Sequence, residues 1–320
     1  MRRLLTLVLA VISLAGCGLV SSSGTFRSAQ LPGADHPLAG AKVTVTSKEF
    51  TEALILGKIT ATYLSAAGAQ VTDLTGAPGS AAARQALTTG AADIMWDYTG
   101  TAWQTYLNRT EAIADPHELW QRVHDVERRE NDLEWLAPAN FNDTYAFAQS
   151  GATAQRLGVR SLSDITKLPV RDRTFCVNDE FFSRSDGLLP MLMKYGIPYN
   201  DPNGVPSGNV THMDSGVIYT ATNRAAPCNF GMIDSTDGRV DSMNLTVLDD
   251  DKKFFLPYSG TAIVRGPVID RYPDLRTVLA PISERLTDEV MRRLNGRVDV
   301  DGQDPADVAY DWLKSEHLIR

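Results

Sequence analysis

The chain has 320 residues, of which 43% are hydrophobic and 22% are charged, with 31 lysine and arginine residues against 39 aspartate and glutamate residues. Its formal net charge of −8 and the lack of a basic run in the sequence argue against nucleic acid as a partner. The length is sufficient for one large domain or for two smaller lobes, each with a core of its own.

The N-terminus has the pattern of an export signal. Arg2 and Arg3 precede the apolar segment 4–14, which is too short for a membrane span of roughly 20 residues. The segment is followed by Ala-Gly-Cys, which resembles the lipobox of bacterial lipoproteins. We therefore predict that residues 1–16 are a lipoprotein signal peptide and that acylated Cys17 holds the protein to the outer face of the cytoplasmic membrane. The alternative is a plain secretory signal that contains a cysteine.

A segment without periodicity follows the predicted cleavage site. Residues 17–40 are rich in Ser, Gly, Ala and Pro, which predicts a flexible tether. The folded body is expected to begin at residue 41, and no apolar stretch within it is long enough in sequence to span a bilayer.

From residue 42 to residue 106, segments typical of strands alternate with segments typical of helices. Strands are expected at 43–45, 71–74 and 92–96, and helices at 51–67 and from the turn 76–80 to Gly90. This alternation predicts a parallel sheet, in which ligands bind beyond the carboxyl ends of the strands. The residues expected to converge at that edge are Lys48, Ser80, Tyr98 and Thr101.

A second set of alternating elements predicts a second lobe. Strands are expected at 173–179, 229–234 and 261–264, and helices at 188–195 and 305–318. The last strand and helix return to the first lobe, so the chain should cross between the lobes twice, at 139–142 and 249–253. The predicted lobes are residues 41–141 with 254–320, and residues 142–253.

Two cysteines remain besides Cys17. Cys176 and Cys228 lie in a chain that is predicted to be exported, and disulfides persist outside the cytoplasm. We expect a bridge between them, with two separate buried thiols as the alternative. Neither has a second Cys or a His at metal-ligand spacing, so we expect no metal site.

Seven short motifs, in order along the chain, resemble those of one known family. They are Lys42–Gly57 (KVTVTSKEFTEALILG), Arg84–Leu87, Asp97–Thr101, Asn142–Ala146, Met213–Gly216, Ser235–Arg239 and Phe254–Tyr258. Each motif is weak alone, but seven with compatible spacing form a specific signal. The chain is therefore similar to the ProX-like glycine betaine, choline and carnitine binding proteins of osmoprotectant ABC importers.

This resemblance implies both architecture and role. The fold would be α/β and of the two-lobed periplasmic-binding-protein type II, with a mostly parallel sheet flanked by helices in each lobe. The protein would be an extracytoplasmic, lipid-anchored monomer that hands its ligand to the transmembrane permease subunits of an ABC transporter. No cofactor is implied.

The resemblance also implies an aromatic cage between the lobes. It places Tyr98, Tyr145 and Tyr258 around the quaternary ammonium group of the ligand. Because a trimethylammonium group cannot donate hydrogen bonds, aromatic faces supply the attraction, at about 0.5–2 kcal/mol per ring. Any one of these tyrosines alone would be read as packing, and the shared motif context favours the cage.

The other implied site residues are charged or polar. Lys48, Thr101 and Arg184 are similar to residues that hold the ligand's carboxylate or line the cleft, and Glu180 is expected to be a structural partner of Arg184. The departure from the family pattern is Asp234, because an aromatic residue usually precedes Ser-Thr-Asp-Gly-Arg. An aspartate there would repel the carboxylate of a zwitterion, which favours choline-like ligands.

Two alternative functions are an exported enzyme and a binding protein for a different ligand. An exported enzyme is disfavoured because the sequence has no Gly-x-Ser-x-Gly, His-Glu-x-x-His or P-loop motif. A binding protein of the same fold for a different ligand, such as an aromatic or polyphenolic compound, would use the same rings and stays open at this point.

Overall fold

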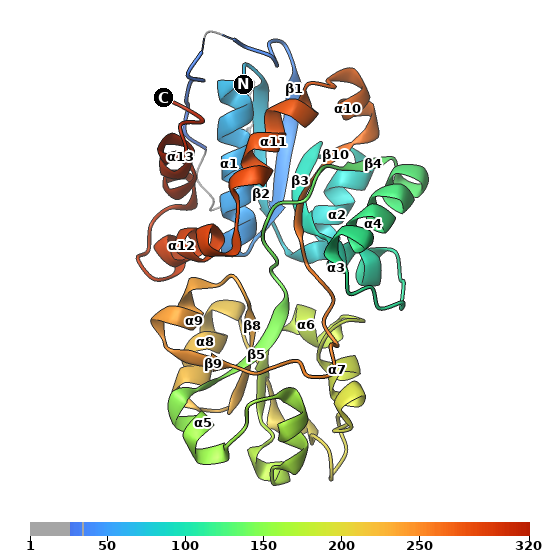
Figure 1. The fold of residues 1–320 in the computed structure, drawn as a ribbon, viewed down its shortest axis with the longest axis vertical. Helices are drawn as coiled ribbons and strands as arrows, with labels where there is room; N and C mark the ends of the chain where they lie inside the picture. The colour runs from blue at the N-terminus through green and yellow to red at the C-terminus, as the bar shows by residue number, and fades with distance from the viewer. Residues whose placement is uncertain (1–25, 34) are drawn as a thin grey trace, which may run out of the picture.

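The computed structural model describes residues 26–33 and 35–320, so the predicted signal peptide and Cys17 lie outside the described residues. The chain forms two lobes, each built around a five-stranded sheet with helices on its faces (Figure 1). Within these described residues, no helix combines the length and the apolar character needed to cross a membrane.

The first lobe contains both the early and the late parts of the chain. Its strands, in spatial order, are β2 (Gln70–Ala77), β1 (Lys42–Lys48), β3 (Ile94–Tyr98), β10 (Gly260–Arg265) and β4 (Leu133–Trp135). Its helices are α1 (Thr51–Ala66), α2 (Gly79–Thr89), α3 (Thr99–Thr101), α4 (Pro116–Asn131), α10 (Gly266–Arg271), α11 (Leu275–Arg285), α12 (Asp288–Asp299) and α13 (Pro305–Ser315). Helix α1 is buried on almost every side because it contacts the sheet as well as α12 and α13.

The second lobe is formed by the middle of the chain. Its strands, in spatial order, are β7 (Val210–His212), β6 (Phe175–Val177), β8 (Phe230–Asp234), β5 (Tyr145–Ser150) and β9 (Leu245–Val247). Its helices are α5 (Gly151–Leu157), α6 (Asp179–Ser183), α7 (Leu188–Tyr195), α8 (Ser215–Arg224) and α9 (Gly238–Ser242). Phe175 forms the centre of its core, with ring centroids 5.5 Å from Phe147 and 5.6 Å from Phe230.

The two sheets have the same topology. In each, three neighbouring strands pair in parallel, and a fourth strand, β10 or β5, pairs antiparallel with the strand on either side of it. Four of the five strands in each sheet therefore point the same way, as the prediction of mostly parallel sheets requires. The reversed strands are those that directly follow the two crossings. The strand order changes direction between β1 and β3 and between β6 and β8, where α/β sheets bind ligands.

Two chain segments join the lobes, one between β4 and β5 and the other between β9 and β10 (Figure 1). They pair through a β-bridge between Asn142 and Ser259. Along the second crossing, Phe255 packs against the core of the second lobe, whereas Leu256 belongs to the core of the first. The second crossing therefore enters the first lobe near residue 256, two residues beyond the predicted boundary.

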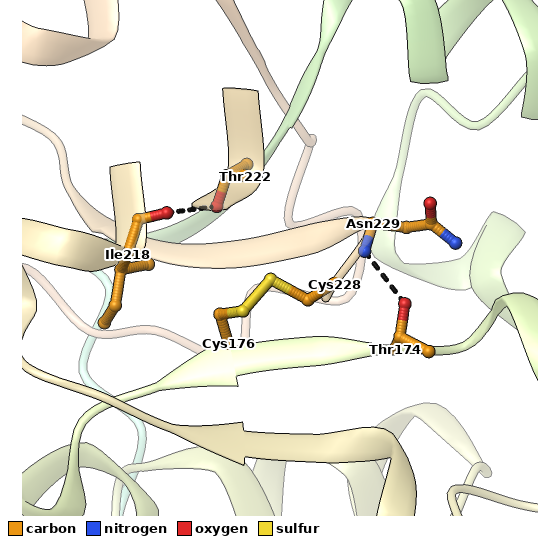
Figure 2. The surroundings of a disulfide bond; sticks show 6 residues. All are labelled: Thr174, Cys176, Ile218, Thr222, Cys228 and Asn229. Atoms are coloured by element: carbon orange, nitrogen blue, oxygen red, sulfur yellow. Dashed lines mark hydrogen bonds between the residues drawn. A yellow bond between two sulfur atoms is a disulfide. The ribbon is translucent and has the colours of Figure 1, made fainter. Parts of the chain in front are cut away.

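A disulfide joins Cys176 in β6 to Cys228, which lies just before β8 (Figure 2). The two Cα atoms are 5.7 Å apart, and both side chains are buried. Beside the bridge, the backbone amide of Asn229 donates a hydrogen bond to Thr174 Oγ1 at 2.8 Å. A loop closed over this separation of 52 residues stabilises a protein by about 2–4 kcal/mol. The bridge thus ties together two strands whose carboxyl ends face the first lobe.

Candidate ligand-binding cleft

A cleft lies between the lobes, where the carboxyl ends of β1 and β3 face those of β6 and β8. Both lobes and both crossings contribute to its wall. The lining residues are Lys48, Glu49, Phe50, Ser80, Tyr98, Thr101, Asp143, Tyr145, Asn178, Glu180, Ser215, Met232, Asp234 and Tyr258. The sheet topology explains this assembly, because each lobe presents the loops at its own switch point to the other lobe.

Most of the predicted site residues meet in this cleft. Six of the seven residues predicted to contact the ligand line it, namely Lys48, Tyr98, Thr101, Tyr145, Asp234 and Tyr258. Ser80, which the strand pattern placed at the same edge, lines it as well. The seventh predicted residue, Arg184, lies outside the lining.

Aromatic rings enter the cleft from both lobes. Tyr145 and Tyr258 lie edge to face, with 5.5 Å between ring centroids, and Tyr145 also packs 4.9 Å from Phe181. The Tyr98 ring centroid lies 6.2 Å from that of Phe50. The aromatic residues in the cleft lining are therefore Phe50, Tyr98, Tyr145 and Tyr258.

The rings are fixed by their hydroxyl groups and by one glycine. The phenol of Tyr98 donates to Glu52 at 2.8 Å, and that of Tyr258 donates to Asp186 at 2.5 Å. A Cβ atom at Gly100 would lie 2.8 Å from the Tyr258 ring, so glycine permits the ring to pack against α3. Rings held in this way need little ordering when a ligand arrives.

Lys48 ends β1 and is neutralised inside the protein. Its ammonium group lies 2.7 Å from Asp97 Oδ1 and 5.1 Å from the centroid of the Tyr98 ring. Asp97 is fully buried and also accepts a hydrogen bond from the Tyr106 hydroxyl at 2.7 Å. The positive charge that Lys48 could offer to a ligand is thus shared with a carboxylate partner.

Arg184 supports the wall of the cleft from behind. Its guanidinium donates to both carboxylate oxygens of Asp186, at 2.6 and 2.5 Å, and to Glu180 at 3.3 Å. It also reaches across to Thr101 of the first lobe at 3.3 Å and lies 5.3 Å from the ring centroid of Tyr145. Asp186 takes the bidentate face of Arg184, and a contact between Arg184 and a ligand stays a prediction.

Carboxyl groups gather where the lobes meet. Burial, followed by the charge of Asp143, raises the pKa of Glu52 well above its usual range. Burial raises the pKa of Asp143 to about 6, with Asp237 adding to the shift. Burial together with Asp143 and Asp237 also raises the pKa of Asp234 well above normal. Ionising these carboxyl groups therefore costs free energy, and a bound cation would lower that cost.

The sequence prediction missed several lining residues. Phe50 follows Lys48 by two positions, Asn178 directly follows β6, and Asp143 lies in the first crossing. Asn178 falls inside the predicted strand 173–179, whereas β6 ends at Val177 and the Asn178 side chain caps α6 by accepting from the Phe181 amide at 2.7 Å. The rule that ligands bind at the carboxyl ends of strands would have included Phe50 and Asn178.

A model of the family described as the substrate binding domain of ABC-type glycine betaine transport system matches residues 41–315. The chain belongs to this family. It is 37% identical over 283 residues to the glycine-betaine-binding protein of Pseudomonas aeruginosa, covering 86% of this chain and 88% of that protein. It is 27% identical over 273 residues to the ergothioneine transport permease/ergothioneine binding protein EgtU of Helicobacter pylori, covering 85% of this chain and 47% of that protein.

The structural comparison agrees with the family. A crystal structure described as a glycine betaine/carnitine/choline ABC transporter has a TM-score of 0.69 and 26% identity, covering 86% of this chain and 99% of that chain. The predicted two-lobed α/β fold is confirmed by this match. Family and fold together identify a substrate-binding protein of the ABC importer class and not an enzyme.

The raised pKa of Asp143 gives the stability of the folded protein a pH dependence. Between about pH 4 and about pH 6, the folded state keeps a proton on Asp143 that the unfolded chain has released, so the free energy of unfolding falls as the pH rises. We expect Asp143→Asn to match the wild type at pH 4 and to exceed it by about 1–3 kcal/mol at pH 8. Urea unfolding at both pH values measures this. The exposed Asp241→Asn is the control, and an equal effect of Asp143→Asn at both pH values contradicts the expectation.

Proposed function

We propose that this protein binds a small quaternary ammonium solute between its lobes and delivers it to the permease of an ABC importer. The observation that carries the proposal is the set of aromatic rings that enter the cleft from both lobes in a chain of this family. Glycine betaine, choline and carnitine are the candidate ligands, and the protein works as a monomer.

The cage consists of Tyr98, Tyr145 and Tyr258, with Phe50 as an additional wall. A trimethylammonium group cannot donate hydrogen bonds, so its attraction to the protein comes from aromatic faces and from negative charge. This cleft supplies both, because carboxyl groups such as Asp234 line it beside the rings. Among the cleft-lining residues, which all belong to the described chain, Lys48 is the only cation, and it is paired with Asp97.

The second candidate function is the binding of a different ligand by a protein of the same fold. A planar heterocyclic betaine would stack on the rings that we assign to the cage, and one relative is named for ergothioneine. Calorimetry with choline, glycine betaine, carnitine and ergothioneine separates the candidates. Binding of one of the first three, with a larger affinity than for ergothioneine, supports the proposal; binding of none of them contradicts it.

The cage assignment is tested most cleanly at Tyr145, because no hydrogen bond of its hydroxyl is found within the described part of the chain. Tyr145→Ala removes one π-face and should weaken ligand binding by about 1–2 kcal/mol, or roughly tenfold. Tyr145→Phe keeps the face and should stay within about twofold of the wild type. Isothermal titration calorimetry measures both, and equal affinities of the Ala variant and the wild type would remove Tyr145 from the cage.

The charge of Asp234 should influence ligand preference. The positive charge of bound choline favours the ionised form of Asp234, whereas glycine betaine adds a carboxylate that opposes it. Asp234→Asn should therefore lower the ratio of choline affinity to betaine affinity by about fivefold, equivalent to about 1 kcal/mol. Competition titrations at pH 8 measure the ratio. An unchanged ratio would show that the Asp234 carboxyl group does not interact electrostatically with the bound ligand.

The lipid anchor is proposed from Cys17 and the segment before it. Acyl chains on Cys17 hold the protein to the membrane, so Cys17→Ser should move it from the membrane fraction to the soluble fraction. Fractionation followed by immunoblotting measures the change. Retention of a cleaved Cys17→Ser protein in the membrane fraction contradicts the anchor.

A further inference from the structure

The motif Ser235–Arg239 lies beside the cleft. Thr236, Asp237 and Arg239 line a second interlobe pocket that shares Asp143 and Asp234 with the cleft, whereas Gly238 lines neither. The contacts of the motif lead to the opposite lobe. Thr236 Oγ1 donates to Glu52 of α1 at 2.5 Å, and Asn295 of α12 donates to the Thr236 carbonyl at 3.0 Å. The same Asn295 amide donates to Glu52 at 3.0 Å. Thr236 of the second lobe thus joins a hydrogen-bonded group formed by Glu52 and Asn295 of the first lobe.

The next contact of the motif is between two backbones. Helix α9 of the second lobe begins at Gly238 and packs against α12 of the first lobe (Figure 1). A Cβ atom at Gly238 would lie 2.6 Å from Gly296 Cα and 2.9 Å from the Arg292 carbonyl oxygen. These are backbone atoms that cannot turn aside, so any side chain at Gly238 would force the two helices apart.

Arg239 adds a charged contact across the same boundary. Its guanidinium is held by Asp237 at 2.5 Å and lies 4.1 Å from the ring centroid of Tyr219. From that position it reaches Asp299 at the end of α12, with 3.6 Å between Nη2 and Oδ2. Asp299 in turn accepts a hydrogen bond from Thr51 at 2.6 Å. The guanidinium therefore links α9 to both α12 and the start of α1.

We propose that Thr236, Gly238 and Arg239 form an interlobe latch, a set of contacts that stabilises the closed arrangement of the lobes. The latch positions the two halves of the cleft without contacting the ligand. Because the ligand is held between the lobes, the free energy of closure is part of the free energy of binding. The latch therefore raises the affinity for every ligand of the cleft by the same factor, whatever its chemistry.

Other interlobe contacts are less informative about closure, because they belong to the cleft wall. Ser80 donates to Glu180, and both residues line the cleft. A substitution there would alter ligand contacts together with lobe contacts. Gly238 lies outside the lining of both the cleft and the adjoining interlobe pocket, so its effect on closure can be measured separately.

The two glycines provide a matched pair of variants. Gly238→Ala places a methyl group against the α12 backbone, whereas a Cβ atom at Gly296 would lie 3.9 Å from its nearest neighbour, Gly238 Cα, which is an ordinary contact. Both substitutions replace a helical glycine by alanine, so their effects on helix propensity are similar. A difference between them therefore reports the interlobe contact.

Closure is measured without any ligand by crosslinking. Ser185 contacts the Gln104 carbonyl across the lobes at 3.2 Å, at positions outside the cleft lining. In a Cys17→Ser background, cysteines at Gln104 and Ser185 are joined by a short bismaleimide, and the rate is compared between variants. We expect Gly296→Ala to crosslink like the parent and Gly238→Ala to crosslink about tenfold more slowly. Urea unfolding confirms that each variant is folded.

Calorimetry with choline and glycine betaine completes the test. The latch predicts that Gly238→Ala weakens the binding of both by the same factor, about tenfold, while Gly296→Ala leaves both within about twofold. A Gly238→Ala variant that crosslinks as fast as Gly296→Ala overturns the latch. If the parent protein binds neither compound, the proposed ligand is wrong, and the crosslinking rates still decide whether the latch exists.

Discussion

The two crossings between the lobes are the constraint on which the rest of the structure depends. They bring the carboxyl ends of both sheets face to face, and each sheet has its switch point at that edge. Residues as distant in sequence as Lys48 and Asp234 consequently share one cleft. The crossings also pair with each other at Asn142 and Ser259, so the two connections between the lobes run side by side at this point.

Acidic groups lie close together where the lobes meet, and the cost of burying their charges is lowered in two ways. Asp97 and Asp186 are matched by Lys48 and Arg184 in buried ion pairs. Asp234 forms no salt bridge within the described residues. Burial, together with Asp143 and Asp237, raises its pKa, and the charge of Arg239 opposes this shift. A cation that enters the cleft would favour the charged form of this group and relieve the cost of its burial. The electrostatics of the cleft are thus complementary to a quaternary ammonium ligand.

The sequence predicted the fold and most of the cleft because both follow from short-range patterns. Alternating strands and helices are visible in the chain, and a residue such as Tyr98 is identified by its place after a strand. The pairing of Arg184 with Asp186, two residues further on, was not predicted, because loop geometry has no periodic signal. The contact between Gly238 and Gly296 could not be predicted from the sequence either, because it depends on how the two lobes dock and not on a local pattern.

Closure and recognition are coupled through the same residues. Tyr258 belongs to the core of the first lobe, yet its hydroxyl donates to Asp186 of the second, whose charge is balanced by Arg184. Tyr145 comes from the second lobe and meets Tyr258 edge to face. When the lobes separate, the hydrogen bond to Asp186 and the contact between these rings must break together. The proposed cage would therefore be complete only in the closed protein, and a ligand that attracts rings from both lobes would favour closure.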